Sequence, residues 1–512
     1  MEIAKLLRGV SVTEAKLTRQ YVTGITSDSR RVREGDMLIC LRGLHHDGHQ
    51  YMADGVMRGA AVVLAETKEG LPEGTDYILC PDTRLAEALV WNNRYGKPAE
   101  GMTGIGITGS NGKTSTAFLL RDLLKAGGKK PGMITTIRTM ADDEEISIAA
   151  GGSSVADAAG AMTTPDPEYF YGAIARMRER GCDTLVYEAS SHALDLYKTD
   201  AIHPEYALFT NLTPEHMDYH GTMEKYLSAK ARLFSMAEKG ICNADDPYAE
   251  ALMRKADGCS FLTCTADPSK FENCDTAAMR YRSHGAEGIS FLYCGRDAIF
   301  RIRTPLAGHF AVYNVTLAVC CALQMGLDPL TVQTALASAK PPEGRMQRLD
   351  TGADMPFSVF IDYAHTPAAL EQVLKTAREM HPAKLTVLFG CGGDRDRSKR
   401  PVMGRIAGQY ADRVVLTGDN PRTEDPLVIL EDILSGMEEN PPEAVIPDRG
   451  EAIRQVIREA EAGEIILLCG KGHEKYEIRG NVRYPFDEAA IAREAVLSRM
   501  ETSKNTGNQN GN

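Results

Sequence analysis

Residues 104–116 read Gly104-Ile-Gly-Ile-Thr-Gly-Ser-Asn-Gly-Lys-Thr-Ser-Thr116, which joins an apolar run to a Gly-Lys-Thr sequence. Residues 102–107 predict a short buried strand, and the segment that opens at Lys113 repeats apolar side chains at helical spacing. A glycine turn between strand and helix lets backbone N–H groups converge on an anion, and the helix N-terminus adds a positive dipole. The stretch therefore predicts a loop that binds the phosphates of a nucleotide.

In a phosphate-binding loop of this kind, the lysine reaches the terminal phosphates and the following hydroxyl binds magnesium. We assign these roles to Lys113 and Thr114. The spacing departs from the common pattern, because five residues separate Gly106 from Gly112 and Ile107 stands where the first glycine would fall. A glycine turn without a ligand is the alternative interpretation. The residues expected to bind the nucleotide here are Gly109, Ser110, Asn111, Gly112, Lys113, Thr114 and Ser115.

The composition is that of a globular protein with several domains. The chain has 512 residues, of which 43% are hydrophobic and 25% are charged. Its formal net charge of -12 argues against nucleic acid as a partner. The cysteines stand without Cys-x-x-Cys pairs, so we expect reduced, mostly buried thiols and no structural zinc. Without a signal-peptide pattern or a long apolar run, we expect a cytoplasmic protein that does not insert into membranes.

The pattern of strands and helices divides the chain into three α/β units. Residues 1–100 form the first unit. Residues 101–339 alternate strands with helices, which is typical of a parallel sheet, and residues 340–500 form a third unit with strands of its own. The polar residues 501–512 are expected to be a disordered tail. We therefore predict an α/β protein of three domains whose middle domain carries the phosphate-binding loop.

Two further strands of the middle unit lead into polar side chains. The strand 183–188 ends at Glu188, and the strand that begins at Tyr206 is followed by His216. Ligands of open α/β sheets lie beyond the carboxyl ends of the strands, so the loop, Glu188 and His216 should meet at one edge. Magnesium prefers oxygen ligands, which Thr114 and Glu188 supply, and His216 could add a nitrogen. The alternative is that His216 is a hydrogen-bonded loop residue.

Lys230 lies on the apolar face of a helix that we predict over residues 223–236. Apolar side chains stand three and four positions before and after it. One account is a lysine that passes the edge of the core and keeps its ammonium group in water. The other account is that burial lowers the pKa of the amine, which then captures CO2 as a carbamate and offers magnesium two oxygens. These residues alone leave both accounts open.

In the third unit, residues 419–422 read Asp-Asn-Pro-Arg and follow a predicted strand. Arg422 could form a carboxylate clamp with Arg395 and Arg397 of another strand-end loop, because arginine presents a planar fork of donors. A proline turn with solvated arginines is the alternative. The motif is therefore a candidate site for a carboxylate ligand.

Six motifs, in this order, resemble those of the Mur ligases over nearly the whole chain, from Thr26 to about Glu488. They read Thr108-Gly-Ser-Asn-Gly-Lys-Thr114, Glu188-Ala-Ser-Ser-His192, Thr210-Asn-Leu-Thr-Pro-Glu-His-Met-Asp-Tyr-His-Gly221, Tyr226-Leu-Ser-Ala-Lys230, Asp362-Tyr-Ala-His-Thr-Pro367 and Gly390-Cys-Gly-Gly-Asp-Arg-Asp396. The resemblance implies an N-terminal UDP-binding domain, a central P-loop ATPase and a Rossmann-like C-terminal domain. It also implies ATP-dependent, ADP-forming amide synthesis for peptidoglycan, in which an acyl phosphate forms and an amine then displaces phosphate.

The resemblance further implies roles for particular residues. By the family pattern Lys230 is carbamylated and is catalytic together with Lys113, Glu188 and His216, while Thr114, Glu188, His216 and the carbamate bind Mg²⁺. The residues implied to hold the rest of ATP are Asn314, Arg345, Asp362 and His365. The residues implied to contact the UDP-muramoyl dipeptide are Ser29, Thr163, Thr164, Ser190 and Lys198. The residues implied to bind the incoming diamino acid are Arg395, Asp419, Asn420, Pro421, Arg422, Gly470 and Glu474.

Two positions depart from the family pattern, which has a glutamine and an arginine where this sequence has Leu196 and Lys198. Lys198 still offers a point charge to a phosphate or carboxylate. Leu196 cannot hydrogen-bond, so we leave it out of the site.

The Asp-Asn-Pro-Arg motif is similar to that of family members that add meso-diaminopimelate, whose far end carries a second carboxylate. Arg422 and Arg395 would hold that carboxylate, whereas L-lysine would leave the arginine unpaired. The expected substrates are therefore ATP, UDP-N-acetylmuramoyl-L-Ala-D-Glu and meso-diaminopimelate, used by a monomer. The alternatives are the same ligase acting on L-lysine, a folylpolyglutamate synthetase, and a non-catalytic ligase-like subunit of an amidotransferase complex.

Overall fold

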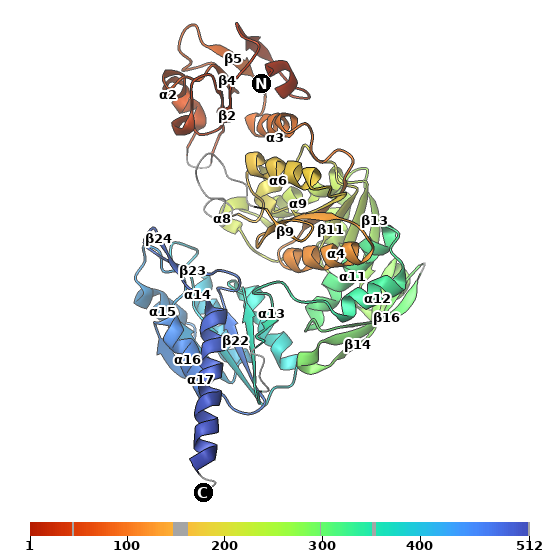
Figure 1. Ribbon diagram of the computed structural model, residues 1–512, viewed down its shortest axis with the longest axis vertical. Coiled ribbons are helices and arrows are strands. Elements are labelled where there is room, and N and C mark those ends of the chain that lie inside the picture. Colours follow the sequence, from red (N-terminus) through yellow and green to blue (C-terminus); the bar gives the residue numbers. More distant parts are fainter. Residues whose placement is uncertain (44–45, 147–161, 297, 351–354, 510–512) are drawn as a thin grey trace. The chain divides into compact units, whose positions relative to one another are not determined.

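The computed structural model describes, with side chains up to residue 500, residues 1–43, 46–146, 162–296, 298–350 and 355–509. The chain, coloured along its sequence in Figure 1, forms two compact units. Unit 1 comprises Met1–Cys264 and Leu317–Asp328. Unit 2 comprises Thr265–Thr316 and the chain from Pro329 onward.

Unit 1 begins with a five-stranded sheet in the order β1-β5-β4-β3-β2. Its strands are β1 (Glu14–Lys16), β2 (Ile25–Thr26), β3 (Met37–Ile39), β4 (Val62–Ala65) and β5 (Asp76–Leu79), and its helices are α1 (Ile3–Leu6), α2 (Met52–Met57) and α3 (Thr83–Arg94). Strand β1 is antiparallel to β5, and the other neighbours are parallel. Strands β3 and β4 are apolar and buried along their whole length, as expected of parallel strands covered on both faces.

The second sheet of unit 1 carries the predicted phosphate-binding loop. Parallel strands lie in the order β13-β12-β11-β6-β10-β7, and β8 and β9 add an antiparallel edge. The strands are β6 (Thr103–Thr108), β7 (Pro131–Ile134), β8 (Thr139–Ala141), β9 (Glu144–Glu145), β10 (Thr184–Glu188), β11 (Tyr206–Phe209), β12 (Lys239–Asn243) and β13 (Ser260–Thr265). The helices are α4 (Lys113–Ala126), α6 (Pro167–Glu179), α7 (Ser191–Asp195), α8 (Met217–His220), α9 (Met223–Ser235) and α10 (Ala249–Lys255).

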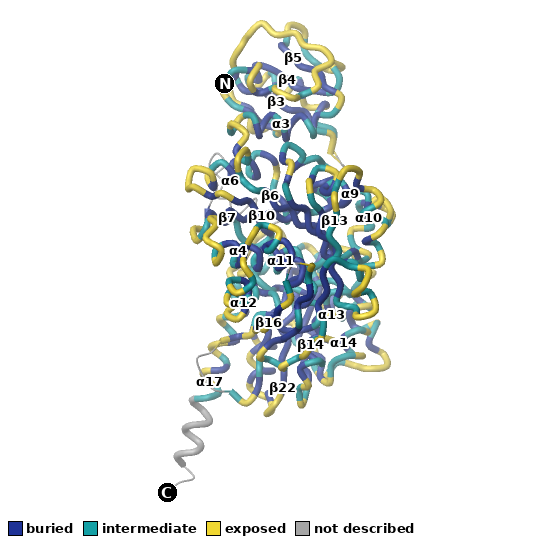
Figure 2. The backbone as a smooth tube through the Cα atoms, turned by 90° about the vertical axis from the view of Figure 1, so that its right-hand side faces the viewer, coloured by how far each residue is buried: buried dark blue, intermediate teal, exposed yellow. Residues whose placement is uncertain are grey.

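The strand order of this sheet reverses at β6. Strands β10 and β7 lie on one side of β6, and β11 and the strands that follow it lie on the other side. Figure 2 shows the central strands β6 and β10 in the colour of buried residues. Ligand crevices of open α/β sheets form at such a reversal, beyond the carboxyl ends of the strands. Residues 109–112 lie at this position, because they join the end of β6 to the start of α4.

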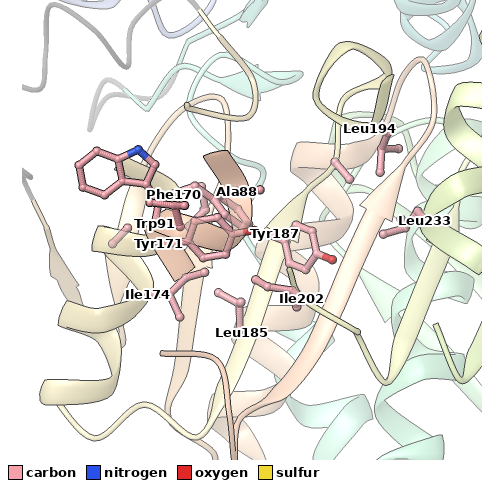
Figure 3. Close-up of a cluster of buried hydrophobic side chains, with 14 of the residues drawn as sticks. Ala88, Trp91, Phe170, Tyr171, Ile174, Leu185, Tyr187, Leu194, Ile202 and Leu233 are labelled. Atoms are coloured by element: carbon pink, nitrogen blue, oxygen red, sulfur yellow. The ribbon is translucent and has the colours of Figure 1, made fainter. Parts of the chain in front are cut away.

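Helices α3 and α6 share one hydrophobic cluster with β10 (Figure 3). Trp91 of α3 and Phe170 and Tyr171 of α6 belong to this cluster and are buried. The rings of Phe170 and Tyr187, on β10, meet edge to face with 5.6 Å between their centroids. Aromatic side chains bury large apolar areas, so this cluster attaches the N-terminal sheet to the middle sheet.

Unit 2 contains an antiparallel group of three strands, a six-stranded sheet and a hairpin. The group consists of β14 (Thr276–Ser283), β15 (Ile289–Gly295) and β16 (Ile299–Thr304). The sheet has the order β17-β18-β22-β19-β20-β21, in which β17 is antiparallel to β18 and the other neighbours are parallel. Its strands are β17 (Gln347–Arg348), β18 (Ser358–Asp362), β19 (Lys384–Phe389), β20 (Arg413–Thr417), β21 (Ala444–Ile446) and β22 (Glu464–Cys469). The antiparallel hairpin consists of β23 (Tyr476–Arg479) and β24 (Val482–Pro485).

The remaining helices begin with α11, whose residues from Leu317 onward belong to unit 1, and end with α17, which follows the last strand. They are α11 (His309–Gln324), α12 (Pro329–Ala337), α13 (Pro367–Glu379), α14 (Lys399–Tyr410), α15 (Pro426–Leu434), α16 (Arg449–Glu459) and α17 (Glu488–Gln509).

A buried arginine joins the carboxyl ends of two strands of the six-stranded sheet. Arg449, at the start of α16, donates to Glu488 Oε2 through Nε at 3.0 Å and Nη2 at 2.7 Å. It also donates to the carbonyl oxygen of Cys469, which ends β22, and to that of Gly418, which follows β20. A charge is stable in the interior only when it is paired and hydrogen-bonded. The pair therefore fixes the starting points of the loops after β20 and β22.

The architecture agrees with the predicted α/β class, and β6, β10, β11, α4 and α9 occur where the sequence predicts them. The sequence analysis missed the β14–β16 group and the β23–β24 hairpin. Buried and exposed side chains alternate along β16, and β24 is exposed throughout, so neither has a continuous apolar run. Strand β15 is mostly buried and was missed in spite of its apolar residues. The expected disordered tail is partly helical, since α17 continues to Gln509. A helix that has already formed extends without a second nucleation step.

Among the described residues, no helix is both long and apolar enough to cross a membrane. The cysteines are free thiols and most of them are buried, in agreement with their predicted state.

Replacing Arg449 by methionine (Arg449→Met) should destabilise unit 2 by roughly 3–5 kcal/mol, because it leaves Glu488 buried without a partner. The midpoint of thermal unfolding followed by circular dichroism should fall. Arg454→Met, an exposed position of the same helix, is the matched control and should leave the midpoint unchanged. The only tryptophan, Trp91, lies in unit 1, so its fluorescence reports separately on that unit. An unchanged circular-dichroism transition in Arg449→Met would contradict the role of this ion pair.

Candidate active site

The loop after β6 has the backbone of a phosphate-binding turn. Gly112 precedes α4 in the left-handed conformation, with φ of 87°. Gly109 has φ of 148°, and a Cβ atom at this position would overlap Thr210 Oγ1 at the end of β11. Glycine is therefore required at residue 109 by both conformation and space.

The residues that follow β11 hold the loop in place. The backbone N–H of Ser110 donates to the Asn211 carbonyl oxygen at 2.8 Å, and that of Asn111 donates to Asn211 Oδ1 at 3.0 Å. Thr210 Oγ1 donates to the Asn111 carbonyl oxygen at 2.6 Å. The Ser110 hydroxyl shares a 3.0 Å hydrogen bond with the Tyr226 hydroxyl of α9. The loop is thus shaped before any ligand arrives.

Thr114 and Glu188 meet, as the sequence predicts. Thr114 Oγ1 donates to Glu188 Oε1 at 2.7 Å, and both residues are buried. Thr136 adds its backbone N–H to Oε1 at 3.2 Å and its hydroxyl to Oε2 at 3.0 Å. A hydroxyl in the first turn of α4 and a carboxylate at the end of β10 form the start of an oxygen site of the kind that Mg²⁺ prefers.

Lys113 and Lys230 approach the same carbonyl oxygen. Lys113 Nζ donates to Gly109 O at 2.9 Å and to Ser110 O at 2.8 Å, and Lys230 Nζ donates to Gly109 O at 2.8 Å. Lys230 is only 1% exposed. Burial lowers the pKa of the Lys230 amine well below its usual value, and the charge of Lys113 lowers it further against the opposing effect of Glu215. The account in which Lys230 keeps its ammonium group in water is therefore wrong.

His216 lies in a group of aromatic rings beside this loop. Its backbone has φ of 57°, and its ring meets that of His192 edge to face at 4.7 Å. Burial lowers the pKa of His216, and Lys113 and Lys230 act in the same direction, whereas Glu215 opposes them. His216 is therefore biased toward the neutral imidazole that can bind a metal or accept a hydrogen bond.

Of the residues expected to contact the UDP-muramoyl dipeptide, two lie beside the candidate magnesium ligand Glu188. Thr164 and Ser190 lie beside Glu188, since Thr164 Oγ1 donates to the Glu188 carbonyl oxygen at 2.8 Å and accepts the Ser190 N–H at 3.0 Å. Lys198 is buried and forms a 2.7 Å ion pair with Asp166. The other members, Ser29 and Thr163, are half-buried.

Three of the residues expected to hold the rest of ATP surround Tyr363 in unit 2. The Arg345 guanidinium carbon lies 4.9 Å from the centre of the Tyr363 ring, and the His365 ring lies 4.6 Å from it. The Asp362 carboxylate accepts two backbone N–H groups at 2.7 and 2.8 Å. Asn314 lies on α11, where it is buried. Sequence reasoning missed Tyr363, although it stands inside the quoted Asp-Tyr-Ala-His motif.

Most residues expected to bind the diamino acid come together after β20 and β22. Asn420 Nδ2 donates to Glu474 Oε2 at 2.8 Å, and a Cβ atom at Gly470, which has φ of 114°, would lie 2.9 Å from Asp419 Oδ2. Burial raises the pKa of Glu474, and the neighbouring Asp419 raises it further. Two carboxylates in a half-enclosed site attract a cationic group.

Arg422 is the cation of this site. It has φ of 52°, and Nη1 donates to the Gly393 carbonyl oxygen at 2.7 Å. Burial lowers the pKa of Arg422, and the charge of Arg395 lowers it further, against the opposing effects of Asp419 and Glu474. Arg397, in contrast, pairs with Asp432 at 2.9 Å. The predicted three-arginine clamp is thus reduced to Arg395 and Arg422, beside the buried Pro421.

Sequence reasoning also missed residues whose hydrogen bonds position the site residues. These are Thr136 and Asn211 in unit 1 and Lys471 in unit 2. Asn211 stands within a quoted motif and Lys471 directly follows Gly470, but a polar residue beside a ligand residue gives no signal of its own in one sequence.

A parallel α/β sheet with a glycine loop, a Lys-Thr helix start and a carboxylate on the adjacent strand defines a P-loop nucleotide-binding protein. Three family models match the chain in order. They are "Mur ligase family, catalytic domain" at residues 21–91, "Mur ligase middle domain" at residues 107–322 and "Mur ligase, glutamate ligase domain" at residues 344–472.

Curated relatives cover nearly the whole chain. The UDP-N-acetylmuramoyl-L-alanyl-D-glutamate--2,6-diaminopimelate ligase of Syntrophomonas wolfei is 37% identical over 510 residues, 98% of this chain and 100% of that protein. The ligase of the same name from Aquifex aeolicus is 37% identical over 478 residues, 93% of this chain and 94% of that protein. A solved structure of a ligase of this name is 30% identical, has a TM-score of 0.67 and covers 98% of this chain and 99% of its own.

The chain belongs to the Mur ligase family and is an ATP-dependent ligase. The predicted family and fold class are therefore confirmed. The individual site residues and the domain boundaries stay predictions.

Gly109→Ala should weaken ATP binding on the order of tenfold or more, because the new Cβ would displace the loop from Thr210. Titration calorimetry with a non-hydrolysable ATP analogue measures this affinity. Gly128→Ala is the matched control, since Gly128 also has a positive φ, of 79°, but a Cβ atom added there would have no atom within 4 Å. Equal affinities of both variants would contradict the packing argument.

Proposed function

We propose that this ligase adds meso-diaminopimelate to the D-glutamate carboxylate of UDP-N-acetylmuramoyl-L-Ala-D-Glu, in the synthesis of the peptidoglycan precursor. The observation that carries the proposal is that Asn420, two residues before Arg422, donates to Glu474 Oε2 at 2.8 Å, and that the charges of Arg395, Asp419 and Glu474 all act on Arg422. An acceptor whose far end bears both a carboxylate and an ammonium group complements this set of charges. Relatives named for the same reaction support the proposal.

We assign Mg²⁺ to Thr114 and Glu188, and the residues fit that ion. A hydroxyl oxygen and a carboxylate lie 2.7 Å apart in a buried position beside the phosphate-binding loop. Mg²⁺ bound there would neutralise charge on the phosphates, which is a large part of phosphoryl-transfer catalysis. Glu188 is a single carboxylate, so a further anionic oxygen donor would complete the site.

Carbamylated Lys230 is the proposed source of these additional oxygens. The neutral amine of Lys230 attacks CO2, an N–C bond forms and one proton leaves to solvent. The lowered pKa of Lys230 supports this step, because only the uncharged amine reacts. The product is an anion, so its charge attracts the ammonium group of Lys113.

Two steps account for the reaction. The D-glutamate carboxylate attacks the γ-phosphorus of ATP, the bond to the β-phosphate oxygen breaks, and ADP and an acyl phosphate result. The amine of the diamino acid then attacks the acyl carbon, an amide forms, phosphate leaves and the ammonium proton is released. Lys113 is suited to hold the transferred phosphate, and the backbone N–H groups of the loop orient the nucleotide.

We assign the reaction to the cytoplasm, where ATP and UDP-linked precursors are present. The phosphates of ATP are assigned to unit 1, whereas the diamino acid and the rest of ATP are assigned to unit 2, so the proposed reaction needs residues of both units.

The direct test supplies the purified protein with ATP, Mg²⁺ and UDP-N-acetylmuramoyl-L-Ala-D-Glu, and adds meso-diaminopimelate or L-lysine in parallel reactions. Release of phosphate and mass spectrometry of the product measure turnover. We expect turnover with meso-diaminopimelate and little with L-lysine. Turnover with L-lysine but not with meso-diaminopimelate would support the ligase reaction and reject the assigned acceptor. No turnover with either would reject the proposed reaction.

Arg422→Met should lower kcat/KM for meso-diaminopimelate on the order of a hundredfold, because a charged hydrogen-bond partner of the far carboxylate is lost. The KM for ATP should not change. Arg397→Met is the control, since Arg397 pairs with Asp432 and should not contact the acceptor. Equal losses in both variants would remove Arg422 from the acceptor site.

Carbamylation is tested by incubating the protein with isotopically labelled bicarbonate and recording the carbamate carbon by NMR. We expect one signal that is lost in Lys230→Met and kept in Lys225→Met, an exposed position of the same helix. A signal that persists without Lys230 would place the carbamate elsewhere.

A further inference from the structure

Lys471 is a buried cation that the proposed reaction does not yet use. It follows Gly470 in the turn after β22 and is only 1% exposed. Lysine is rarely buried to this extent unless its charge is paired. The groups that contact its ammonium group therefore indicate its role.

The Lys471 ammonium group is directed at the acceptor site. Nζ donates to Asn420 Oδ1 at 3.0 Å and to the Tyr476 carbonyl oxygen at 2.9 Å. It also forms an ion pair with Asp419 Oδ1 at 3.5 Å. Within the described part of the chain, this oxygen of Asp419 is buried and has no hydrogen-bond partner.

Lys471 also determines how the Asn420 amide is turned. Asn420 Oδ1 accepts from Lys471 Nζ and from the Ile478 backbone N–H at 2.9 Å. Because both donors require the oxygen end, the NH2 end must point the other way, where it donates to Glu474 Oε2 at 2.8 Å. A single ammonium group thus sets the position of two carboxylates, Asp419 directly and Glu474 through Asn420.

We propose that Lys471 is a positioning residue that orients Asp419 and Glu474 to bind the ammonium group at the far end of the diamino acid. The inference rests on the proposed function, and it divides the acceptor site in two. Arg422 and Arg395 recognise the far carboxylate, whereas the carboxylates held by Lys471 recognise the far ammonium group. The second feature is common to meso-diaminopimelate and L-lysine.

A purely structural alternative is that Lys471 only anchors β23 through the Tyr476 carbonyl oxygen. The two roles differ in their effect on Glu474. The groups that face Glu474 are Asp419, Lys471, Arg422, Tyr363 and Tyr476. Lys471 lowers the pKa of Glu474, so removing its charge should raise that pKa. The acid limb of kcat/KM for the acceptor, where Glu474 takes up a proton, should then move to higher pH.

The experiment compares wild-type protein with Lys471→Met and with Lys475→Met. Lys475 lies four residues further along, is 58% exposed and pairs with Glu343, so it is the matched control. In Lys471→Met we expect the KM for the acceptor to rise on the order of tenfold to a hundredfold. The KM values for ATP and the UDP-dipeptide should stay unchanged, and the acid limb should shift upward. Lys475→Met should match wild type in every measurement.

Unchanged acceptor KM, or equal changes in all three KM values without a shift of the acid limb, would overturn the proposal. Circular dichroism checks that the variant is folded. If Lys471→Met does not fold, Lys471→Gln carries the test, because it keeps a hydrogen-bond donor without the charge. If neither variant folds, Lys471 is an element of the fold and the proposal is wrong.

The wild-type measurement separates this inference from the proposed function. If wild type uses L-lysine and not meso-diaminopimelate, the assigned acceptor fails, and the Lys471 variants are then measured with L-lysine, whose far ammonium group is the same. If wild type uses neither, both the reaction and this inference are rejected.

Discussion

The carbonyl oxygen of Gly109 accepts two ammonium groups, and the chemistry of unit 1 depends on this arrangement. Lys113 comes from the start of α4 and Lys230 from the middle of α9, so the contact joins two helices at the carboxyl end of β6. Two cations that share one acceptor in a buried place repel each other, and the more deeply buried one loses its proton more easily. The loop that is proposed to bind phosphate thereby also favours the uncharged form of the Lys230 amine.

In unit 2, two buried cations are likewise held by hydrogen bonds to buried partners. Arg449 holds the strand ends of β20 and β22, and Lys471 holds the side chains that emerge from them. Both residues position the loops after β20 and β22 without a direct contact to a ligand. Because the loops after parallel strands have few backbone partners of their own, interior cations supply the hydrogen bonds that position them.

The sequence predicts the parts of this molecule that depend on local pattern. The apolar run before Gly109, the helical spacing around Lys230 and the strand that ends at Glu188 all follow from periodicity, and the structure contains them. The sequence alone did not reveal Thr136 or Tyr363, because their importance comes from contacts with residues that are distant in the chain. It also overestimated Arg397, since only tertiary structure shows that Asp432 already pairs with it. Strand β16 was missed for the related reason that its alternating buried and exposed side chains form no continuous apolar run.

The β23–β24 hairpin has a thermodynamic consequence for the acceptor site. Two strands alone are marginally stable in water, and this hairpin is fastened by the backbone of Arg422, which donates to Ile478 and accepts from Gly480. Asn420 and Lys471 fasten it further. We therefore expect the hairpin and the loop that carries Asn420 and Arg422 to open and close together, so that amide hydrogen exchange in the hairpin would report ligand binding at the proposed acceptor site.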